Sequence, residues 1–412
     1  GCTIRADQTT LHTPGLDTTP FLAELASRGA RFTDVIAAAP WTRPSSAALI
    51  TGRHPAAIGM VEPLRKRNDR KLPEEVKTLA EVLSEGGYTT LGVTANPNVD
   101  AFFGFDQGFD AYTSLSVPWR YQDAQKVTGK ALVEATLAEV RERADPARPV
   151  YLQVMLVDAH QPSHLPPREV RAFEAPGVPP HVADYRAMLR AFDRSVHALH
   201  SGLTDLGITE ENAIFMVISD HGEGLGVPAH HGRGHGRYLY PSTVQLVWVT
   251  AGVGVATNHE IGGVASGVDL LPTVLGLVDL PEPEGVSGDD WSTQMGGDSA
   301  KTTRRVAWTD TRFLEVDRSG VYTTDRACFV LHDARSVQTI PGRGDNPTFV
   351  PGCFDRSADP DFTEPFPDED LEAELRSWRR EVDGKLSEWS EQVEEATPEE
   401  LQQALEALGY AE

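Results

Sequence analysis

Val150-Tyr151-Leu152-Gln153-Val154-Met155-Leu156-Val157 is a nearly continuous apolar run that leads into Asp158-Ala159-His160. A run of this kind predicts a strand that is buried on both faces of a parallel sheet. Residues 213–218 and 246–250 form two further apolar runs of the same character. Together the three runs indicate that a buried sheet forms the centre of the fold.

Segments with helical periodicity alternate with these runs. The predicted helices cover residues 19–28, 73–85, 124–143, 185–206 and 268–277, and residues 88–94 predict one more strand. Alternation of this kind is typical of an α/β fold with a mostly parallel sheet flanked by helices. In such folds the functional side chains gather beyond the carboxyl ends of the strands.

The pattern changes after residue 285. Short apolar runs now alternate with turn residues, as at residues 321–326, and residues 368–408 are charged and helical in pattern. We therefore expect an α/β catalytic domain at residues 1–285 and a small C-terminal antiparallel α+β subdomain at residues 286–412. Cys328 and Cys353 lie in two of the short runs, where they could form a disulfide or remain as two buried thiols.

The chain is acidic. Its 412 residues include 37 Lys and Arg against 61 Asp and Glu, which gives a formal net charge of -24. This charge argues against a nucleic acid or an anionic membrane surface as partner, and it is typical of a solvated acidic surface. A small anionic substrate remains compatible with it, because a bound metal can reverse the local sign. No apolar run is long enough for a transmembrane segment.

Thr42 lies in the segment Pro40-Trp41-Thr42-Arg43-Pro44-Ser45-Ser46, which is followed by Ala47-Ala48-Leu49-Ile50-Thr51-Gly52. Pro44 and Ser45 suit the first turn of a helix that Gly52 can end. The Thr42 hydroxyl therefore lies at or just before a helix N-terminus, which favours anions. Taken alone it fits a helix cap better than a nucleophile.

Histidine and aspartate follow two of the predicted strands. Asp220-His221 comes directly after residues 213–218, and His160 comes after the run at residues 150–157. A loop rich in glycine and histidine, which contains His235, follows Asp220-His221. A carboxylate and an imidazole at one strand end can both reach a divalent metal, so this edge of the sheet is a candidate metal site.

These segments, in this order, resemble the sulfatase family, the sulfatase branch of the alkaline phosphatase superfamily. The resemblance covers nearly the whole chain. It rests on Cys2-Thr3-Ile4-Arg5-Ala6-Asp7, Asp17-Thr18-Thr19-Pro20, Trp41-Thr42-Arg43-Pro44-Ser45, Phe103-Gly104-Phe105-Asp106, Asp158-Ala159-His160, Ser219-Asp220-His221-Gly222-Glu223, Gly234-His235-Gly236 and Asp269-Leu270-Leu271-Pro272. It implies an alkaline-phosphatase-like fold.

The resemblance also implies a mechanism. Asp220, His221 and Thr42 would hold a divalent metal ion (Ca, Mg, Mn or Zn), and Thr42 would attack sulfur or phosphorus in line. His160 and His235 would bind the charged oxygens of the ester or protonate the leaving group. The implied substrate is a small anionic ester of a glycan, a lipid headgroup or an aryl alcohol. The alternative is a catalytically impaired member that binds an anionic glycan or lipid headgroup.

Three positions depart from the family pattern. Sulfatases carry Cys or Ser at the position of Thr42, which is converted to formylglycine, whereas phosphodiesterases and phosphoethanolamine transferases of the superfamily carry Thr. The resemblance therefore favours phosphorus chemistry in a sulfatase-like protein. Ser46 replaces the arginine that usually ends the motif. Asn96 lies where the family has a Lys-x-His pair, and a turn residue before Pro97 is the simpler interpretation.

Cys2 occupies the position of a metal-binding aspartate in the family, and the first strand of the family pattern is missing before it. A thiolate can bind zinc but suits calcium or magnesium poorly. Gly1-Cys2 could equally be the scar of a truncation or the acylated end of a processed lipoprotein. We expect a periplasmic or extracellular protein, with a lipid anchor on Cys2 as one form of it.

Overall fold

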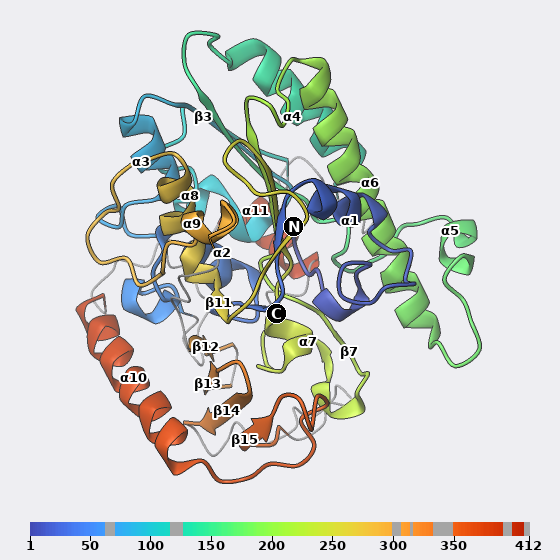
Figure 1. The fold of residues 1–412 in the computed structure, drawn as a ribbon, viewed down its shortest axis with the longest axis vertical. Coiled ribbons are helices and arrows are strands. Elements are labelled where there is room, and N and C mark those ends of the chain that lie inside the picture. The colour runs from blue at the N-terminus through green and yellow to red at the C-terminus, as the bar shows by residue number, and fades with distance from the viewer. Residues whose placement is uncertain are drawn as a thin grey trace.

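The computed structural model describes residues 1–61, 71–115, 127–298, 306–313, 316–332, 349–389 and 398–407. Within these residues helices and strands alternate, so the predicted α/β fold is confirmed (Figure 1). Residues 124–126, 390–397 and 408, which we assigned to helical segments, lie outside the described residues.

The central strands form two main sheets. One is a parallel three-stranded sheet in the order β4 (Ala111–Ser114), β3 (Thr89–Thr94) and β5 (Val150–Met155). The other has the order β10 (His259–Ile261), β1 (Ala30–Phe32), β9 (Trp248–Gly252) and β6 (Ile214–Ile218). Parallel pairing also joins β10 to β1 and β11 (Ala265–Ser266) to β2 (Val35–Ile36), whereas β9 runs antiparallel to β1 and to β6.

Gly1 and Cys2 connect the carboxyl ends of β5 and β6. The amino group of Gly1 donates to Ile218 O at 2.8 Å, and Cys2 N donates to Leu156 O at 3.0 Å. Both β5 and β6 are half-buried, and our prediction of strands buried on both faces was wrong. Among the described residues each of the two strands pairs along one edge only, which leaves part of its surface uncovered.

Helices cover the sheets from two sides (Figure 1). α4 (Gly129–Arg143) and α6 (Pro180–Asp205) run side by side, and α1 (Pro20–Arg28) packs against α6 and β9. On the other side, α3 (Leu79–Glu85) packs its leucines against α8 (Leu270–Leu277). α3 begins at Leu79 rather than at Pro73, because Thr78 and Glu81 form a reciprocal capping box there.

α2 (Thr42–Thr51) forms as the sequence predicts. Pro44 and Ser45 lie in its first turn, and Gly52 ends it in the left-handed region at φ 65°. Every residue of α2 is buried. Trp41 is the N-cap and Thr42 is the first helical residue, so the hydroxyl of Thr42 lies in the first turn and Thr42 is not the N-cap of α2.

The C-terminal part forms an antiparallel sheet, as predicted. β12 (Ala307–Thr311), β13 (Arg318–Tyr322), β14 (Arg326–Leu331) and β15 (Gly352–Asp355) follow one another in space, and α10 (Glu369–Glu388) packs on β13 and β14 (Figure 1). Cys328 and Cys353 oppose each other on β14 and β15 and form a disulfide. The remaining helices are α5 (Pro167–Arg171), α7 (Pro241–Val244), α9 (Ser292–Met295) and α11 (Glu399–Ala407). The proposed boundary at residue 285 falls between α8 and α9 and stays a prediction.

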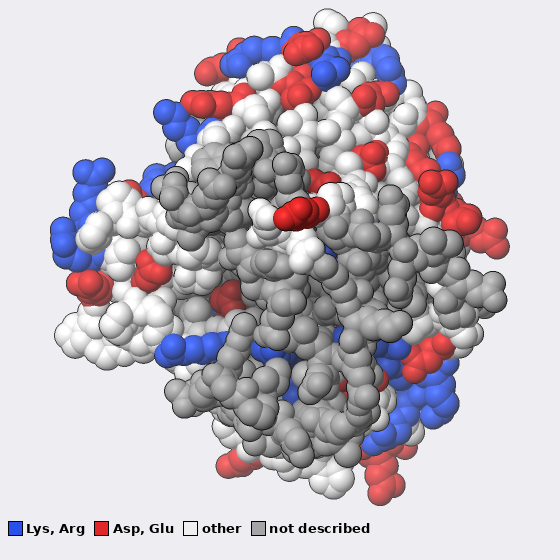
Figure 2. Space-filling model, turned by 180° about the vertical axis from the view of Figure 1, so that it is seen from behind, with Lys and Arg blue, Asp and Glu red and all other residues white. Residues whose placement is uncertain are grey.

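Many of the charged side chains lie at the surface in mixed groups. On the face shown in Figure 2, basic and acidic side chains alternate along the upper edge. Many of them form ion pairs one helical turn apart, such as Lys130 with Glu134 and Arg143 with Glu139 on α4. None of the helices in the described ranges has the length and apolarity that crossing a membrane requires.

Candidate active site

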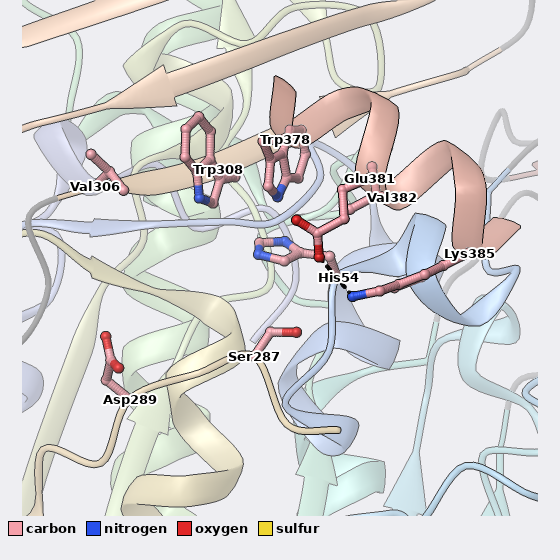
Figure 3. Close-up of a pocket in the computed structure, with 10 residues that line it drawn as sticks. His54, Ser287, Asp289, Val306, Trp308, Trp378, Glu381, Val382 and Lys385 are labelled. Atoms are coloured by element: carbon pink, nitrogen blue, oxygen red, sulfur yellow. Dashed lines mark hydrogen bonds and ion pairs between the residues drawn. The ribbon is translucent and has the colours of Figure 1, made fainter. Parts of the chain in front are cut away.

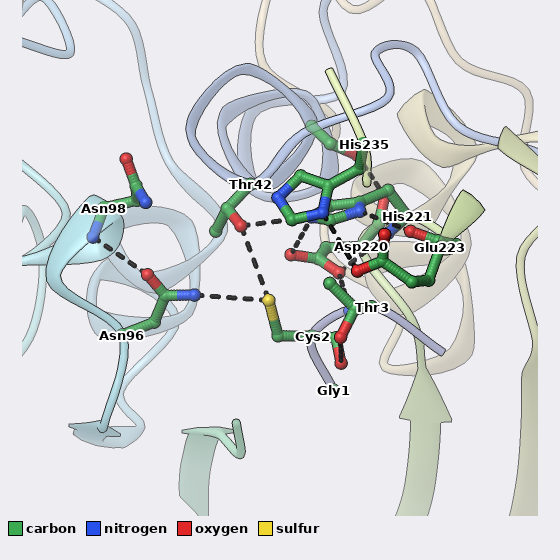
Figure 4. Close-up of polar contacts among 12 residues, drawn as sticks. Gly1, Cys2, Thr3, Thr42, Asn96, Asn98, Asp220, His221, Glu223 and His235 are labelled. Atoms are coloured by element: carbon green, nitrogen blue, oxygen red, sulfur yellow. Dashed lines mark hydrogen bonds and ion pairs between the residues drawn. The ribbon is translucent and has the colours of Figure 1, made fainter. Parts of the chain in front are cut away.

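Four polar side chains from distant parts of the chain meet at the N-terminal end of α2 (Figure 4). Thr42 Oγ1 lies 3.2 Å from Nε2 of His221 and 3.5 Å from Sγ of Cys2. Asp220 Oδ2 lies 3.4 Å from the same His221 nitrogen. Cys2, Asp220 and His221 each offer a ligand atom within 4.8 Å of the others, and all three are buried.

Backbone contacts fix the orientation of Asp220 and His221. Oδ1 of Asp220 accepts from Thr3 N at 3.1 Å and from His221 N at 2.7 Å. Nδ1–H of His221 donates to Gly222 O at 2.8 Å. Since Nδ1 carries the proton, Nε2 presents its lone pair to Thr42 and to Asp220. Oδ2 of Asp220, in turn, has no hydrogen-bond partner in the described part of the chain.

His235 and His160 form the opposite side of the site. The ring of His235 lies 4.5 Å from the ring of His221 and 5.2 Å from that of His160, measured between centroids. Nδ1–H of His235 donates to Oε2 of buried Glu223 at 3.1 Å. Nδ1–H of His160 donates to Gln161 O at 2.5 Å. Both contacts fix the orientation of the imidazole ring.

Asn96 completes the surroundings of Cys2. Its Oδ1 accepts from Asn98 N at 2.9 Å, which is the turn contact that the sequence predicts. Its Nδ2, however, donates to Cys2 Sγ at 3.3 Å. Asn96 is therefore both a turn residue and a neighbour of the site, because the turn leaves its amide N–H facing Cys2. Sequence reasoning assigned it only the first of these roles.

Burial shifts the pKa values of the clustered groups toward their neutral forms. It raises the pKa of the Cys2 thiol well above its ordinary value, and the carboxylate of Asp220 adds to this shift. Burial also raises the pKa of Asp220, and it lowers the pKa of His221 well below the ordinary value with help from nearby His235. Charged ligands crowded into a dry cluster are destabilised without a counter-charge.

The cluster suits a divalent cation. A buried carboxylate oxygen without a hydrogen-bond partner and a bare imidazole nitrogen point at the same volume, which also borders a thiol and a hydroxyl. Metal binding would satisfy these acceptors and offset the cost of burying negative charge. Cys2, Asp220, His221 and Thr42 are the residues that would hold the ion.

The C-terminal antiparallel sheet and the loop after β12 contact the segments that flank the site. Asp310 N donates to Ala38 O at 3.0 Å, in the loop before α2. Phe313 packs edge-on against Trp41, with centroids 5.4 Å apart. Gly236, next to His235, donates through its N–H to Pro40 O at 2.9 Å. The sheet and this loop therefore help to fix both Thr42 and His235.

A separate pocket of about 480 Å³ opens beyond the C-terminal end of α2 (Figure 3). Its wall includes the stacked rings of Trp308 and Trp378, 5.2 Å apart, and His54, which follows α2. A helix of this length rises about 15 Å. The pocket and the Thr42 cluster therefore lie at opposite ends of α2.

The fold and the cluster define an alkaline-phosphatase-like α/β protein with a buried hydroxyl at its centre. The family model for sulfatases matches residues 3–280, and the chain belongs to the sulfatase family. It is 27% identical over 316 residues to the ulvan-active sulfatase of Formosa agariphila, over 66% of this chain and 59% of that protein. The chain thus spans about three fifths of the length of the curated relatives that it matches first.

Solved structures show the same fold. A protein in complex with its substrate D-glucosamine-2-N,6-O-disulfate has a TM-score of 0.71 at 15% identity, over 94% of this chain and 97% of its own. The phosphonate monoester hydrolase of Agrobacterium radiobacter has a TM-score of 0.69 at 15% identity, over 94% of both chains. The predicted fold class and family are therefore confirmed.

The structure brings together every site residue that the sequence singled out: Thr42, His160, Asp220, His221 and His235. Their chemical roles stay predictions. Sequence reasoning assigned no role to Glu223, although its place in the motif three positions after Asp220 was a signal. Sequence reasoning linked Cys2 to the site only through the resemblance to the sulfatase family. The residues around Cys2 in the sequence do not indicate a contact with Thr42.

Proposed function

We propose that this chain is a metal-dependent hydrolase or transferase of a phosphate or sulfate ester, with Thr42 as the nucleophile. One observation carries the proposal: the Thr42 hydroxyl lies 3.2 Å from Nε2 of His221, inside the cluster with Cys2 and Asp220. A hydroxyl that only capped a helix would not require the side chains of Cys2, Asp220 and His221 around it. The positive end of α2 adds a field that favours an anionic ester at this point.

The residues divide the work as follows. Asp220, His221 and Cys2 would hold a divalent cation, which would supply a lowered pKa for a bound hydroxyl and positive charge opposite the ester. Thr42 Oγ1 attacks phosphorus or sulfur as the bond to the leaving oxygen breaks, which leaves the group on Thr42. Water completes hydrolysis, and an acceptor alcohol completes transfer.

His235 and His160 act on the ester oxygens. The carboxylate of Glu223 accepts from Nδ1–H of His235 and holds the ring. In the imidazolium form, Nε2–H can then donate to a non-bridging oxygen or to the leaving oxygen. His160 lies beside His235 and can bind a second oxygen. Positioning and charge stabilisation of this kind account for most of the catalysis of phosphoryl transfer.

Thr42 favours a phosphorus ester over a sulfate ester. Threonine keeps its hydroxyl, and the residue types that yield formylglycine are absent at this position. A phosphodiester or a phosphonate ester of a glycan, a lipid headgroup or an aryl alcohol fits a hydroxyl nucleophile with one metal. Sulfated glycans are the substrates named for some proteins of similar sequence or fold, and they form the comparison arm of the test.

We place the protein in the periplasm or outside the cell. The disulfide between Cys328 and Cys353 supports this, because such bonds form and persist in oxidising compartments. A lipid on Cys2 would require its sulfur to leave the cluster, where it is fully buried.

The test is turnover of aryl phosphodiesters, phosphonate monoesters, phosphate monoesters and aryl sulfates by the purified, metal-analysed protein. We expect the phosphorus esters to be cleaved faster than the sulfate ester, and activity to be lost with a chelator and in Thr42→Ala. A phosphoryl adduct on Thr42 should appear by mass spectrometry under single turnover. A folded, metal-loaded protein that cleaves none of these esters would overturn the proposal and favour the binding role.

A further inference from the structure

The donor atoms around Thr42 have the geometry of a small tetrahedral site. The measured separations are 3.5 Å from Cys2 Sγ to Thr42 Oγ1, 3.2 Å from Thr42 Oγ1 to His221 Nε2, and 3.4 Å from His221 Nε2 to Asp220 Oδ2. A tetrahedron with metal–ligand bonds of about 2.0–2.3 Å has edges of about 3.3–3.8 Å. These three separations match such edges, and the ligand atoms of Cys2, Asp220 and His221 all lie within 4.8 Å of one another.

Two of these atoms are placed to bind a cation. Asp220 uses Oδ1 for two backbone N–H groups, and its Oδ2 is buried without a hydrogen-bond partner among the described residues. His221 uses Nδ1–H for Gly222 O, so Nε2 has only a lone pair to offer to Asp220. Two acceptors face each other at 3.4 Å, and a positive ion between them resolves the conflict.

Cys2 decides which ion fits. Calcium takes six to eight oxygen ligands and magnesium an octahedron of oxygens, whereas this cluster offers one sulfur, one nitrogen and two oxygens. Thiolate, imidazole and carboxylate in a four-coordinate arrangement are typical of zinc.

Asn96 supports the thiolate. Its Oδ1 is occupied by Asn98 N, so it faces Cys2 with its N–H rather than with an oxygen ligand. A donor of this kind outside the ligand shell stabilises a metal-bound sulfur and sets its orientation. An aspartate at position 2 would find the same N–H, but it would offer a hard oxygen in place of the sulfur.

We propose that this chain binds zinc through Cys2, Asp220, His221 and Thr42. Cys2 changes the metal preference of a sulfatase-type site from ions that prefer oxygen ligands, such as calcium and magnesium, to zinc. This inference deepens the function proposed above by naming its metal, and it rests on that function for the role of Thr42 as nucleophile. The identity of the metal is independent of turnover and can be measured separately.

The test is metal competition together with cobalt substitution. The full chain, freed of metal, is dialysed against equimolar zinc, manganese, magnesium and calcium, and the bound metal is measured by mass spectrometry. We expect zinc at one ion per chain. The Co²⁺ form should show a sulfur-to-cobalt charge-transfer band in the near ultraviolet and the strong visible bands of a tetrahedral ion.

Variants assign these signals to Cys2. Cys2→Asp should lose the charge-transfer band and reduce the preference for zinc over magnesium by about 100-fold or more. Cys2→Ser, which has nearly the same shape, should lose the band as well, and circular dichroism shows whether each variant folds. Cys328→Ala with Cys353→Ala removes the other two cysteine sulfurs and should leave the charge-transfer band unchanged.

The results separate this inference from the proposed function. Preferential uptake of calcium or magnesium by the wild-type chain, or a cobalt spectrum that is the same in the wild type and in Cys2→Ser, overturns the zinc site. A chain with zinc and the sulfur band but without turnover of any ester keeps the zinc site and contradicts the proposed function instead.

Discussion

Oγ1 of Thr42 and Nε2 of His221 lie 3.2 Å apart although 179 positions separate them in the sequence. α2 supplies the hydroxyl from its first turn, and the loop after β6 supplies the nitrogen. The bond from Nδ1–H to Gly222 O leaves only a lone pair on Nε2, so the hydroxyl can donate to it. Without a metal, the hydroxyl can donate to Nε2. With a metal, Thr42 and His221 would both be ligands, and coordination would activate the hydroxyl.

Replacing Thr42 tests this relationship most directly. Thr42→Ala should reduce kcat/KM by about 10³-fold or more because the attacking oxygen is absent, while Thr42→Ser should keep a large part of the activity. The free energy of unfolding should change by only about 1 kcal/mol, measured in urea.

Thr51 provides the matched control for Thr42. It lies at the other end of α2, is also buried, and donates its hydroxyl to Ala47 O at 2.7 Å. Thr51→Ala should alter the stability by a similar amount and leave kcat unchanged. Equal loss of activity in Thr42→Ala and Thr51→Ala would show that α2 packing, rather than the Thr42 oxygen, limits the reaction.

Glu223 is predicted to be a positioning residue for His235. Its Oε2 accepts from Nδ1–H of His235 at 3.1 Å, and the pair lies next to His221. Glu223→Gln keeps the shape but removes the charge, so kcat should fall by about 10- to 100-fold with little change in KM. Glu223→Asp should recover part of kcat. A uniform rise in KM without a change in kcat would assign Glu223 to substrate binding instead.

Apolar patterns in the sequence predict where the helices and strands of this fold lie better than they predict the direction in which each strand runs. The run at residues 213–218 becomes β6, and residues 246–250 overlap β9 (Trp248–Gly252). The antiparallel direction of β9 was not predictable, because an apolar run carries no information about which way the chain enters the sheet. Helix starts depend on single side chains, and the Thr78–Glu81 capping box moved the start of α3 past Pro73.

The site was predictable to the extent that strand ends carry it. Asp220, His221 and His160 follow β6 and β5, and the rule that active residues gather beyond strand ends was enough to group them. Cys2 could not be placed that way, because its position depends on two backbone hydrogen bonds, to Leu156 and from Asp220 to Gly1. The contact between Asn96 and Cys2 depends in turn on a side-chain amide whose direction is set by the turn at Asn98.

His231 should make the stability depend on pH. The ring is buried, stacks on Tyr240 at 4.4 Å, and donates through Nε2 to Asp361 O at 3.0 Å. Burial lowers the pKa of His231 from 6.5 to about 3. Between these values the unfolded chain binds the proton more tightly than the folded chain, so the stability is fully present above pH 6.5 and is lost as the pH falls toward 3.

The measurement is urea unfolding at pH 6.5 and pH 5. His231→Phe keeps the stacking on Tyr240 but cannot be protonated, so its loss of stability between these pH values should be about 2 kcal/mol smaller than that of the wild type. His164→Phe, at an exposed position, should follow the wild type. Identical pH dependence in His231→Phe and the wild type would mean that the ring becomes charged in the folded protein without cost.

The disulfide should stabilise the C-terminal sheet. Cys328 and Cys353 oppose each other on β14 and β15 and close a loop with a sequence separation of 25 residues. Closing a loop of this length restricts the unfolded chain by about 3 kcal/mol. Cys328→Ala with Cys353→Ala should therefore lower the free energy of unfolding by about that amount, and a reductant should destabilise the wild type but not the double variant.

Thiol titration of the denatured, unreduced chain should find one thiol per chain, that of Cys2, since the other two cysteines are paired. Three reactive thiols in protein secreted into an oxidising compartment would contradict both the disulfide and the location that we propose from it.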